Sequence, residues 1–368
     1  MGEVAVEVRG LVKRFGGVVA VDRLDLAVAR GEFLSLLGPS GCGKTTTLRM
    51  IGGLETPSAG SIEIGGRDIA GVPANRRPTS IVFQDYALFP HMTVRDNVAF
   101  GLKMRGVGQR ERRQRAETML ETVDLAGFGD RQPRQLSGGQ RQRVALARSL
   151  VIEPDVLLLD EPLGALDALI RRQMQSALRR LQRALGLTFL YVTHDQEEAM
   201  AMSDRLIVMH DGRIAQQGEP EEVYRRPETE FVARFLGECN LFPATIVGGA
   251  GDRVELASAP LGRFAARRGH VSPRLAGDAC LAAIRPEDVR IGPPDAGRLR
   301  GAVEERSYLG ARTRYVVATD RTTFIVIADE RGAVAAGDAV GIDWSDDAVS
   351  LVAPEAPPAP DGREGSGP

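Results

Sequence analysis

The sequence predicts an α/β domain with a helical insert, followed by a small all-β domain. Short apolar runs alternate with helical stretches over residues 3–236, which is the pattern of strands and helices packed in layers. From about residue 241 to 353 the runs are short and are separated by Gly, Pro and Asp, as in a small barrel or sandwich. A glycine-rich loop typical of phosphate binding follows one of the N-terminal runs. We therefore expect two domains, of which the first binds a nucleotide.

Composition restricts the classes of function. The chain has 368 residues, 43% of them hydrophobic, and a net charge of −2, so no bulk attraction to nucleic acid is expected. Its three cysteines are far apart in the sequence, which fits a reducing compartment rather than a disulfide framework. The sequence has no run of about 18 apolar residues and no signal-peptide pattern at its start. Any role at a membrane is therefore expected to be peripheral.

The elements of the first domain follow from periodicity. Strands are expected at 4–8, where valines alternate with polar residues, and at the continuous apolar runs 33–37, 80–83, 156–159 and 188–192. The last two runs lack alternation, as central parallel strands do. Helices are expected at 94–104, 112–123, 139–150 and 168–185, and a helical insert is expected to occupy about 94–150. In the second domain, strands are expected at 241–247, 314–317 and 323–328, and residues 354–368 are expected to be a disordered tail.

The glycine-rich loop lies between a predicted strand and a predicted helix, and it matches Gly-x4-Gly-Lys-Thr. The glycines let backbone N–H groups surround a phosphate chain at the helix N-terminus. Lys44, in a chain with only three lysines, is expected to reach the β- and γ-phosphates of ATP, and Thr45 to ligate Mg²⁺. The residues expected to bind nucleotide here are Gly38, Pro39, Ser40, Gly41, Cys42, Gly43, Lys44, Thr45 and Thr46.

Polar residues follow three predicted strands at the edge where parallel strands end, which is where ligands bind in such sheets. Asp160 and Glu161 follow 156–159, Gln84 follows 80–83, and His194 follows 188–192. Asp160 suits Mg²⁺, with Gln84 as a further candidate ligand, and Glu161 is placed to polarise the attacking water. His194 is expected to contact the γ-phosphate, with a structural histidine as the alternative. Together with Lys44, the residues Gln84, Glu161 and His194 are the predicted catalytic set.

Four further features admit both a functional and a structural interpretation. Leu136 is followed by Ser137, Gly138, Gly139 and Gln140, which open a helix and predict either an anion site or an ordinary serine N-cap. Asp167 is expected either to bridge two nucleotide domains or to cap the following helix. Phe15 is expected either to stack on adenine or to pack at an edge. The apolar cluster at residues 86–90 favours either a groove for a partner helix or core packing under a loop.

Taken together, these residues resemble the ATP-binding subunit of ABC transporters, over the chain up to about residue 353. In the terms of that family, Phe15 is the A-loop aromatic, residues 38–45 the Walker A motif and residues 156–161 the Walker B motif. Gln84 corresponds to the Q-loop, residues 136–140 to the signature, Asp167 to the D-loop and His194 to the switch histidine. The C-terminal part resembles the OB-like TOBE domain of importer ATPases through residues 284–288 and 308–310.

The resemblance implies partners and a location. Each ATP would lie between one chain's Walker motifs and the signature of a second chain, so a homodimer with ATP and Mg²⁺ is expected. Two membrane permease subunits would dock near residues 84–92, a solute-binding protein would act indirectly, and no nucleic acid would bind. The chain would lie peripherally on the cytoplasmic face of the plasma or inner membrane.

The sequence indicates the transported solute only through its resemblance to known importer groups. The run at residues 235–243 resembles the spermidine/putrescine importer group, so a polyamine is the first expectation. Iron(III), sugars or glycerol phosphate are the alternatives. A soluble ABC ATPase acting on nucleic acid or ribosomes is a further alternative, disfavoured by the single nucleotide domain and the charge of −2. The signature and His194 count against a kinase or GTPase outside this family.

Overall fold

The computed structural model describes residues 3–164, 166–329 and 334–355. The chain divides into two compact units, one ending at Pro220 and one beginning at Glu221. This division comes earlier than the domain boundary expected near residue 236. The reason is that the short helices α7 (Pro220–Arg225) and α8 (Glu230–Phe235) are hydrogen-bonded to C-terminal strands. For example, Ser350 Oγ donates to the carbonyl of Arg225 at 2.8 Å, and Thr229 forms a bridge with Ala353. Most of the predicted tail, from residue 356 on, lies outside the described residues.

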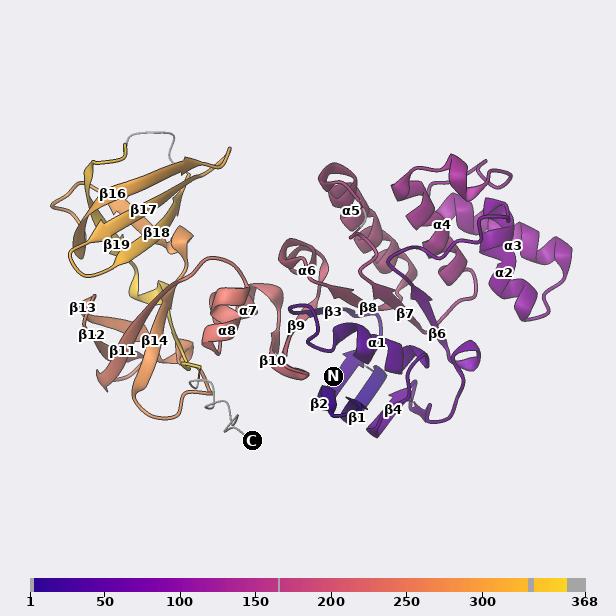
Figure 1. The fold of residues 1–368 in the computed structure, drawn as a ribbon, viewed down its shortest axis with the longest axis horizontal. Coiled ribbons are helices and arrows are strands. Elements are labelled where there is room, and N and C mark those ends of the chain that lie inside the picture. The colour runs from indigo at the N-terminus through magenta and orange to yellow at the C-terminus, as the bar shows by residue number, and fades with distance from the viewer. Residues whose placement is uncertain (1–2, 165, 330–333, 356–368) are drawn as a thin grey trace, which may run out of the picture. The chain divides into compact units, whose positions relative to one another are not determined.

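A six-stranded sheet forms the centre of the first unit, in the order β10-β9-β3-β8-β7-β6 (Figure 1). Strands β3, β6, β7, β8 and β9 are parallel, and β10 is antiparallel to β9. Every residue of β3, β7 and β8 is buried, which explains why these sequences lack polar alternation. The strands are β3 (Phe33–Leu37), β6 (Thr79–Val82), β7 (Val156–Asp160), β8 (Thr188–Thr193), β9 (Arg205–His210) and β10 (Arg213–Gly218). The predicted α/β fold is confirmed.

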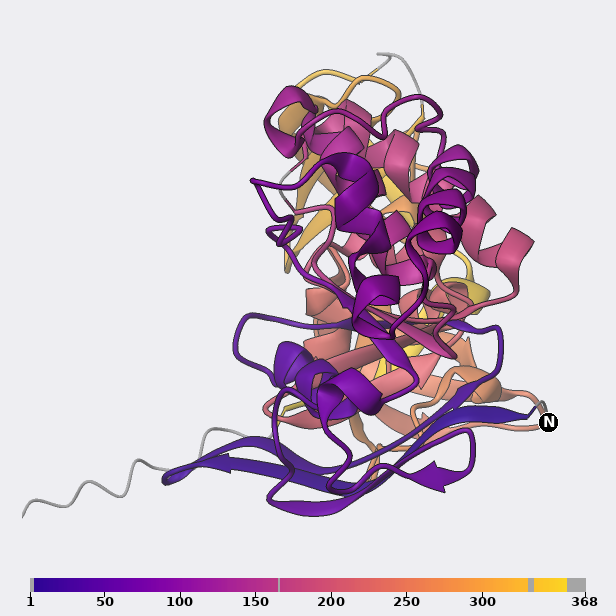
Figure 2. The same ribbon diagram turned by 90° about the vertical axis from the view of Figure 1, so that its right-hand side faces the viewer.

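A second, antiparallel sheet forms a separate layer of the first unit (Figure 2). Its order is β2-β1-β4-β5, and β1 pairs with β2 along nearly its whole length. Helix α1 (Lys44–Gly52) contacts β2 of this layer as well as β6, β7 and β8 of the central sheet. The strands are β1 (Val4–Phe15), β2 (Val18–Ala29), β4 (Ala59–Ile64) and β5 (Arg67–Asp68). The first helix after the phosphate loop is thus packed between two layers.

The helical insert lies between β6 and β7 and contains α2 (Val94–Met104), α3 (Gln109–Thr122) and α4 (Gly138–Leu150). Leu102 of α2, Leu120 of α3 and Val144 of α4 meet in one buried cluster. Helices α5 (Ala168–Leu185) and α6 (Gln196–Met202) follow β7 and β8. Short 3-10 helices lie at η1 (Ala74–Arg76) and η2 (Pro133–Gln135). In the described part of the chain, no helix combines the length and the apolar character needed to cross a bilayer.

The second unit consists of two five-stranded antiparallel sheets, in the orders β13-β12-β11-β14-β20 and β15-β19-β16-β17-β18. Phe242, Phe264, Phe324 and Trp344 from both sheets share one core. The strands are β11 (Asn240–Gly248), β12 (Arg253–Ser258), β13 (Gly262–Arg267), β14 (Ala279–Ile284), β15 (Val289–Gly292), β16 (Leu299–Tyr308), β17 (Thr313–Thr319), β18 (Thr323–Ala328), β19 (Ala339–Trp344) and β20 (Val349–Val352), with 3-10 helices η3 (Arg268–His270), η4 (Pro286–Asp288) and η5 (Asp346–Ala348). The prediction of an all-β C-terminal domain is confirmed.

Arg285 connects α7 and α8 to this β unit. Arg285 is 4% exposed, and its guanidinium lies over the ring of Tyr224, with Cζ 4.1 Å from the ring centroid. It donates to the carbonyls of Tyr224 at 2.8 and 3.1 Å, of Ala233 at 2.9 Å and of Glu238 at 3.2 Å. Because buried donors and acceptors must be paired, one side chain satisfies three backbone carbonyls that would otherwise be orphaned.

Replacing Arg285 with methionine is expected to destabilise the second unit by about 3 kcal/mol, because the charged hydrogen bonds are lost and three carbonyls are left unpaired. Urea unfolding followed by tryptophan fluorescence measures this directly. The chain has a single tryptophan, Trp344, and it is 2% exposed in the core of this unit. Arg290→Met, which changes an exposed arginine, is the control. Equal midpoints for the two variants would refute the assigned role of Arg285.

Candidate nucleotide site

The phosphate loop joins the end of β3 to the start of α1. Gly41 has φ of +82° and Gly43 has φ of +100°, in the left-handed region that favours glycine. A Cβ at Gly38 would lie 2.4 Å from the carbonyl oxygen of Met209, and one at Gly43 would lie 2.5 Å from that of Ala20. Steric packing therefore requires glycine at 38 and 43, and backbone conformation requires it at 41 and 43. Pro39 and Ser40, at the turn, are half-buried and exposed respectively.

The loop provides donors suited to phosphate. Among the described hydrogen bonds, none is donated by the backbone amides of Thr45 and Thr46, which lie in the first turn of α1. Free N–H groups at a helix start favour an anion. Lys44 is 5% exposed, and its Nζ donates to the carbonyls of Gly38 at 2.7 Å and Pro39 at 2.8 Å. The chemistry of these amides and of the ammonium group suits a nucleotide phosphate chain.

Cys42 is buried within the same loop, with its Sγ 3.7 Å from Lys44 Nζ. Burial raises the pKa of the Cys42 thiol. A buried neutral thiol is a weak nucleophile, so the structure suggests no chemical role for it.

Thr45 and Asp160 form the part of the site suited to a metal. Thr45 Oγ1 donates to Asp160 Oδ1 at 2.9 Å, which joins the start of α1 to the end of β7. Burial raises the pKa of Asp160, and the hydrogen bond from Thr45 partly offsets this effect. A hydroxyl and a carboxylate in contact are the oxygen donors that Mg²⁺ prefers. These two residues could hold Mg²⁺ beside a phosphate chain.

Glu161 and His194 are brought together by the sheet register. Asp160 pairs with Val192 of β8, so the residues just beyond these two strand ends are neighbours. His194 Nδ1 lies 3.0 Å from Glu161 Oε2. Glu161 has φ of +46°, which is uncommon for a non-glycine residue, and its amide donates to the carbonyl of Val192 at 3.0 Å. Strain at a strand end is typical of functional positions. The side chain of His194 is 60% exposed, so it is open to solvent at this edge of the sheet.

Gln84 is exposed just beyond β6. A Cβ built on Gly164 would lie 3.6 Å from Gln84 Nε2 and 3.5 Å from the carbonyl of Glu161. The amide therefore lies beside the segment that follows Glu161. Tyr86, in contrast, is 6% exposed and belongs to the core, so core packing is the correct interpretation for this member of the apolar cluster. Leu88 and Phe89 are half-buried and Pro90 is exposed.

Ser137 and Asp167 both cap helices, as their structural alternatives predict. Ser137 Oγ accepts from the amide of Gln140, and Gln140 Oε1 accepts from the amide of Ser137 at 2.9 Å. Asp167 accepts from the amide of Ile170 at 3.0 Å. The two caps are close in space, because Cβ atoms built on Gly138 and Gly139 would lie 3.1 Å from Leu166 and Ile170 side chains. Within the described residues, no hydrogen bond links residues 137–140 to the phosphate loop.

Phe15, at the end of β1, is 48% exposed and therefore available for stacking. Lys13 Nζ lies 4.7 Å from the centroid of its ring and is held by Glu55 Oε1 at 2.6 Å and the Thr56 carbonyl at 2.8 Å. Lys13 belongs to none of the motifs in the sequence, so its role beside Phe15 was not predicted. The sequence feature that could have drawn attention to this residue is its type, because it is one of only three lysines in the chain.

Arg171 is another residue that the sequence did not reveal. From the start of α5, it donates to the carbonyl of Leu166 and to Asp195 Oδ2, both at 3.1 Å. It therefore ties the segment before Asp167 to the segment after His194. No local pattern distinguishes it from the neighbouring arginines of the same helix.

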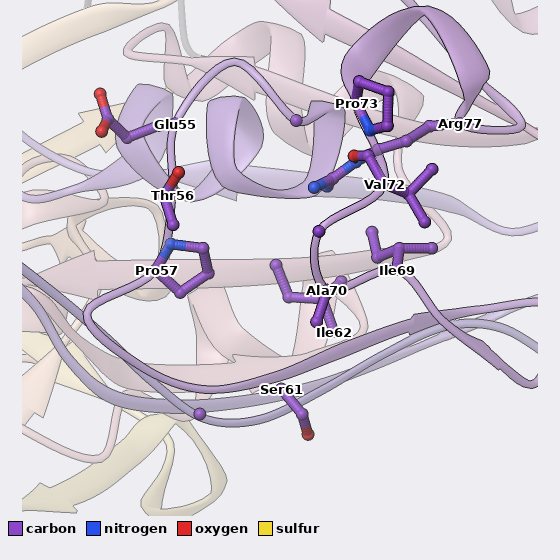
Figure 3. Close-up of a pocket in the computed structure, with 13 residues that line it drawn as sticks. Glu55, Thr56, Pro57, Ser61, Ile62, Ile69, Ala70, Val72, Pro73 and Arg77 are labelled. Carbon is purple, nitrogen blue, oxygen red and sulfur yellow. The ribbon is translucent and has the colours of Figure 1, made fainter.

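A cavity of 330 Å³ lies at the other end of α1 and contains none of the predicted site residues (Figure 3). Arg77 lines it and donates to the carbonyls of Met50 at 2.7 Å and Ile51 at 2.8 Å, so its charge caps the C-terminus of α1. A Cβ on Gly53 would lie 2.5 Å from Arg77 Nε. The arginine is thus a structural cap.

The family follows from comparison with known proteins. A model of the ABC transporter family matches residues 21–164, and a model of the TOBE domain matches residues 282–352. The spermidine/putrescine import ATP-binding protein PotA of Thermobifida fusca is 48% identical over 343 residues, which cover 88% of this chain and 86% of that protein. The chain belongs to the family of ABC transporter ATP-binding proteins. It is accordingly an ABC-type ATPase that binds ATP.

Other relatives carry a different name. The Fe(3+) ions import ATP-binding protein FbpC of Rhizobium etli is 49% identical over 320 residues, covering 86% of this chain and 88% of that protein. Among solved structures, the ATP-binding cassette MJ0796, a dimer in a post-hydrolysis state bound to ADP and Pi, is 32% identical with a TM-score of 0.52. It covers 58% of this chain and 98% of that protein. The ABC fold of the first unit is therefore shared.

Proposed function

We propose that this ABC ATPase energises a polyamine importer through ATP-driven closure of a homodimer. The observation that carries the proposal is the meeting of Lys44, Asp160, Glu161 and His194 at one edge of the sheet, through the contacts Thr45–Asp160 and Glu161–His194. Phosphoryl transfer requires mainly positioning and charge stabilisation, and this arrangement provides both. Lys44 and the amides of residues 43–46 would hold the phosphates. Thr45, Asp160 and Gln84 would ligate Mg²⁺, which would neutralise phosphate charge.

Glu161 is proposed to accept the proton of the attacking water. Its hydrogen-bond partner His194 orients the carboxylate and is free, being exposed, to contact the γ-phosphate. Phe15 would stack on adenine. The exposed Ser137 with Gly138, Gly139 and Gln140, and Asp167, would meet the ATP of a second copy, which is why a homodimer is proposed.

Two permease subunits are proposed to dock near residues 84–92. Leu88 and Phe89 are half-buried there, beside the exposed Pro90, so the segment presents part of an apolar surface. The chain would then lie peripherally on the cytoplasmic face of the membrane, and a solute-binding protein would act through the permeases. No role with nucleic acid is proposed, given the net charge of −2.

The polyamine assignment rests on residues 235–243 and on the name of the Thermobifida fusca relative. An iron(III) importer is the second candidate, because the Rhizobium etli relative is similarly identical.

Uptake by the source cells tests this function and separates the two solutes. Cells carrying Glu161→Gln in place of the wild-type chain should lose uptake of labelled putrescine and spermidine and keep iron(III) uptake. Glu197→Gln, an exposed carboxylate on α6, is the matched control and should leave uptake unchanged. Loss of iron uptake alone would establish the second candidate, and unchanged uptake of both would exclude both.

A further inference from the structure

Arg148, in the last turn of α4, holds the loop that follows Gln84. Its Nη1 donates to the carbonyl of Ala87 at 2.6 Å and its Nη2 to the carbonyl of Tyr86 at 2.8 Å. Its Cζ also lies 5.7 Å from the centroid of the Phe89 ring. The planar guanidinium therefore binds two successive carbonyls at once, a geometry that an ammonium group does not match.

The backbone that Arg148 holds is strained. Tyr86 has φ of +62° and Ala87 has φ of +44°, so two successive non-glycine residues lie in the left-handed region. Such conformations persist only where neighbouring groups hold them. Within the described residues, Arg148 donates no hydrogen bond to a carboxylate, so its two hydrogen bonds go to the strained carbonyls. Arg148 in α4 therefore helps to hold this conformation, together with the hydrogen bonds that the Tyr86 amide donates to the Phe83 carbonyl and the Phe89 amide donates to Asn97 Oδ1.

Helix α4 also contacts the strand that precedes this loop, and its N-terminus is the segment proposed to contact the ATP bound by the second chain. Ser149 Oγ donates to the carbonyl of Ile81 in β6, the strand that leads into the loop, at 3.4 Å. The N-terminus of α4 is Ser137 to Gln140, the segment expected to meet the partner's ATP. A helix is stiff over this length, so displacement of residues 86–87 would be transmitted to residues 137–140.

Unpaired buried groups lie on both sides of this connection. The hydroxyl of Tyr86 and both amide atoms of Gln142 in α4 are buried, and none of them has a hydrogen-bond partner among the residues that the structure describes. Buried polar groups are normally paired, so these three atoms mark places where the packing of the loop and the helix leaves polar groups unsatisfied in this structure. A bistable contact is the physical requirement for transmission between sites.

We propose that Arg148 is the positioning residue that couples the loop at residues 84–89 to α4, so that the permease-facing loop and the signature segment move together. The inference rests on the proposed function for the roles of those two segments. The coupling itself is a property of the chain alone.

Hydrogen exchange of the purified full-length chain tests the coupling without permeases. In the Glu161→Gln background, MgATP should change the exchange of residues 85–89 and of residues 138–141 together. With Arg148→Met added, residues 138–141 should still respond to MgATP, while residues 85–89 should exchange at least about tenfold faster and respond no longer. Arg143→Met is the matched control, because Arg143 lies on the same helix but bonds the carbonyl of Val123. If the double variant shows the same coupled responses as Glu161→Gln alone, the proposal is overturned.

Steady-state kinetics provide a second measurement. Arg148→Met should lower kcat about tenfold and leave KM for ATP within about twofold, because the nucleotide contacts remain. Arg148→Lys keeps the positive charge but loses the planar guanidinium that binds two carbonyls at once, so it should recover part of kcat. This variant replaces Arg148→Met in the test if the methionine variant does not fold. An unchanged kcat in both variants would refute the proposal. If wild-type cells take up no polyamine, the proposed function is wrong. The hydrogen-exchange and kinetic results on Arg148 would still hold, because they do not depend on the solute.

Discussion

Replacing Glu161 with glutamine should lower ATP hydrolysis by about 10³-fold while leaving ATP affinity nearly unchanged, a loss typical of removing a positioned general base. Glutamine has the same shape but cannot accept the proton of the attacking water. His194 Nδ1, 3.0 Å from the carboxylate, would retain a hydrogen-bond partner, so the local geometry should survive. Single-turnover hydrolysis of labelled ATP, together with equilibrium binding, separates the two effects.

The same variant should accumulate as an ATP-bound dimer, because closure would no longer be followed by hydrolysis. Size-exclusion chromatography with and without MgATP detects that species. Glu197→Gln is the control, since Glu197 is exposed on α6 three residues beyond His194. If Glu161→Gln hydrolyses ATP at the wild-type rate, the base lies elsewhere. If it binds ATP and stays monomeric, the proposed sandwich of two chains is wrong.

The phosphate loop was predictable because the residues that form it are consecutive in the sequence. Glycines at 38, 41 and 43 are required by backbone conformation or by a carbonyl within 2.5 Å, so the motif appears as consecutive letters. Central strands such as β7 and β8 were predictable for a similar reason, since burial on both faces removes polar residues. Helix α3 starts at Gln109, before the predicted start at residue 112. The prediction missed the first turn because this turn is polar and carries no apolar periodicity.

Contacts between residues distant in the sequence were not predictable. Arg285 bonds the carbonyl of Tyr224, 61 residues away, and such contacts place α7 and α8 with the β unit rather than with the first domain. Arg148 bonds the carbonyl of Tyr86, 62 residues away. A single arginine on a helix gives no signal of which carbonyl it will reach. A strand end could be predicted to bear function, but the contact between Glu161 and His194 required the register of β7 with β8.

Lys44→Ala is expected to weaken ATP binding about 100-fold, which corresponds to the loss of charge-assisted hydrogen bonds to phosphate. Lys44 is 5% exposed and bonds only carbonyls and the Cys42 thiol of its own loop, with no carboxylate among its described hydrogen-bond partners. Its buried charge is therefore available for an anion. Titration calorimetry of the full-length chain with ATP, with and without Mg²⁺, measures the change.

The two hydrogen bonds from Lys44 to Gly38 and Pro39 also stabilise the empty loop, so loss of affinity must be separated from loss of structure. Lys44→Met retains the aliphatic stem and should lose affinity to a similar extent, while the fluorescence of Trp344 verifies that the second unit is folded. Lys103→Ala, at an exposed lysine of α2, should bind ATP as the wild type does. If both Lys44 variants bind ATP within about twofold of the wild type, the phosphates are held by the backbone amides of residues 43–46 alone, and the charge of Lys44 serves the loop rather than the nucleotide.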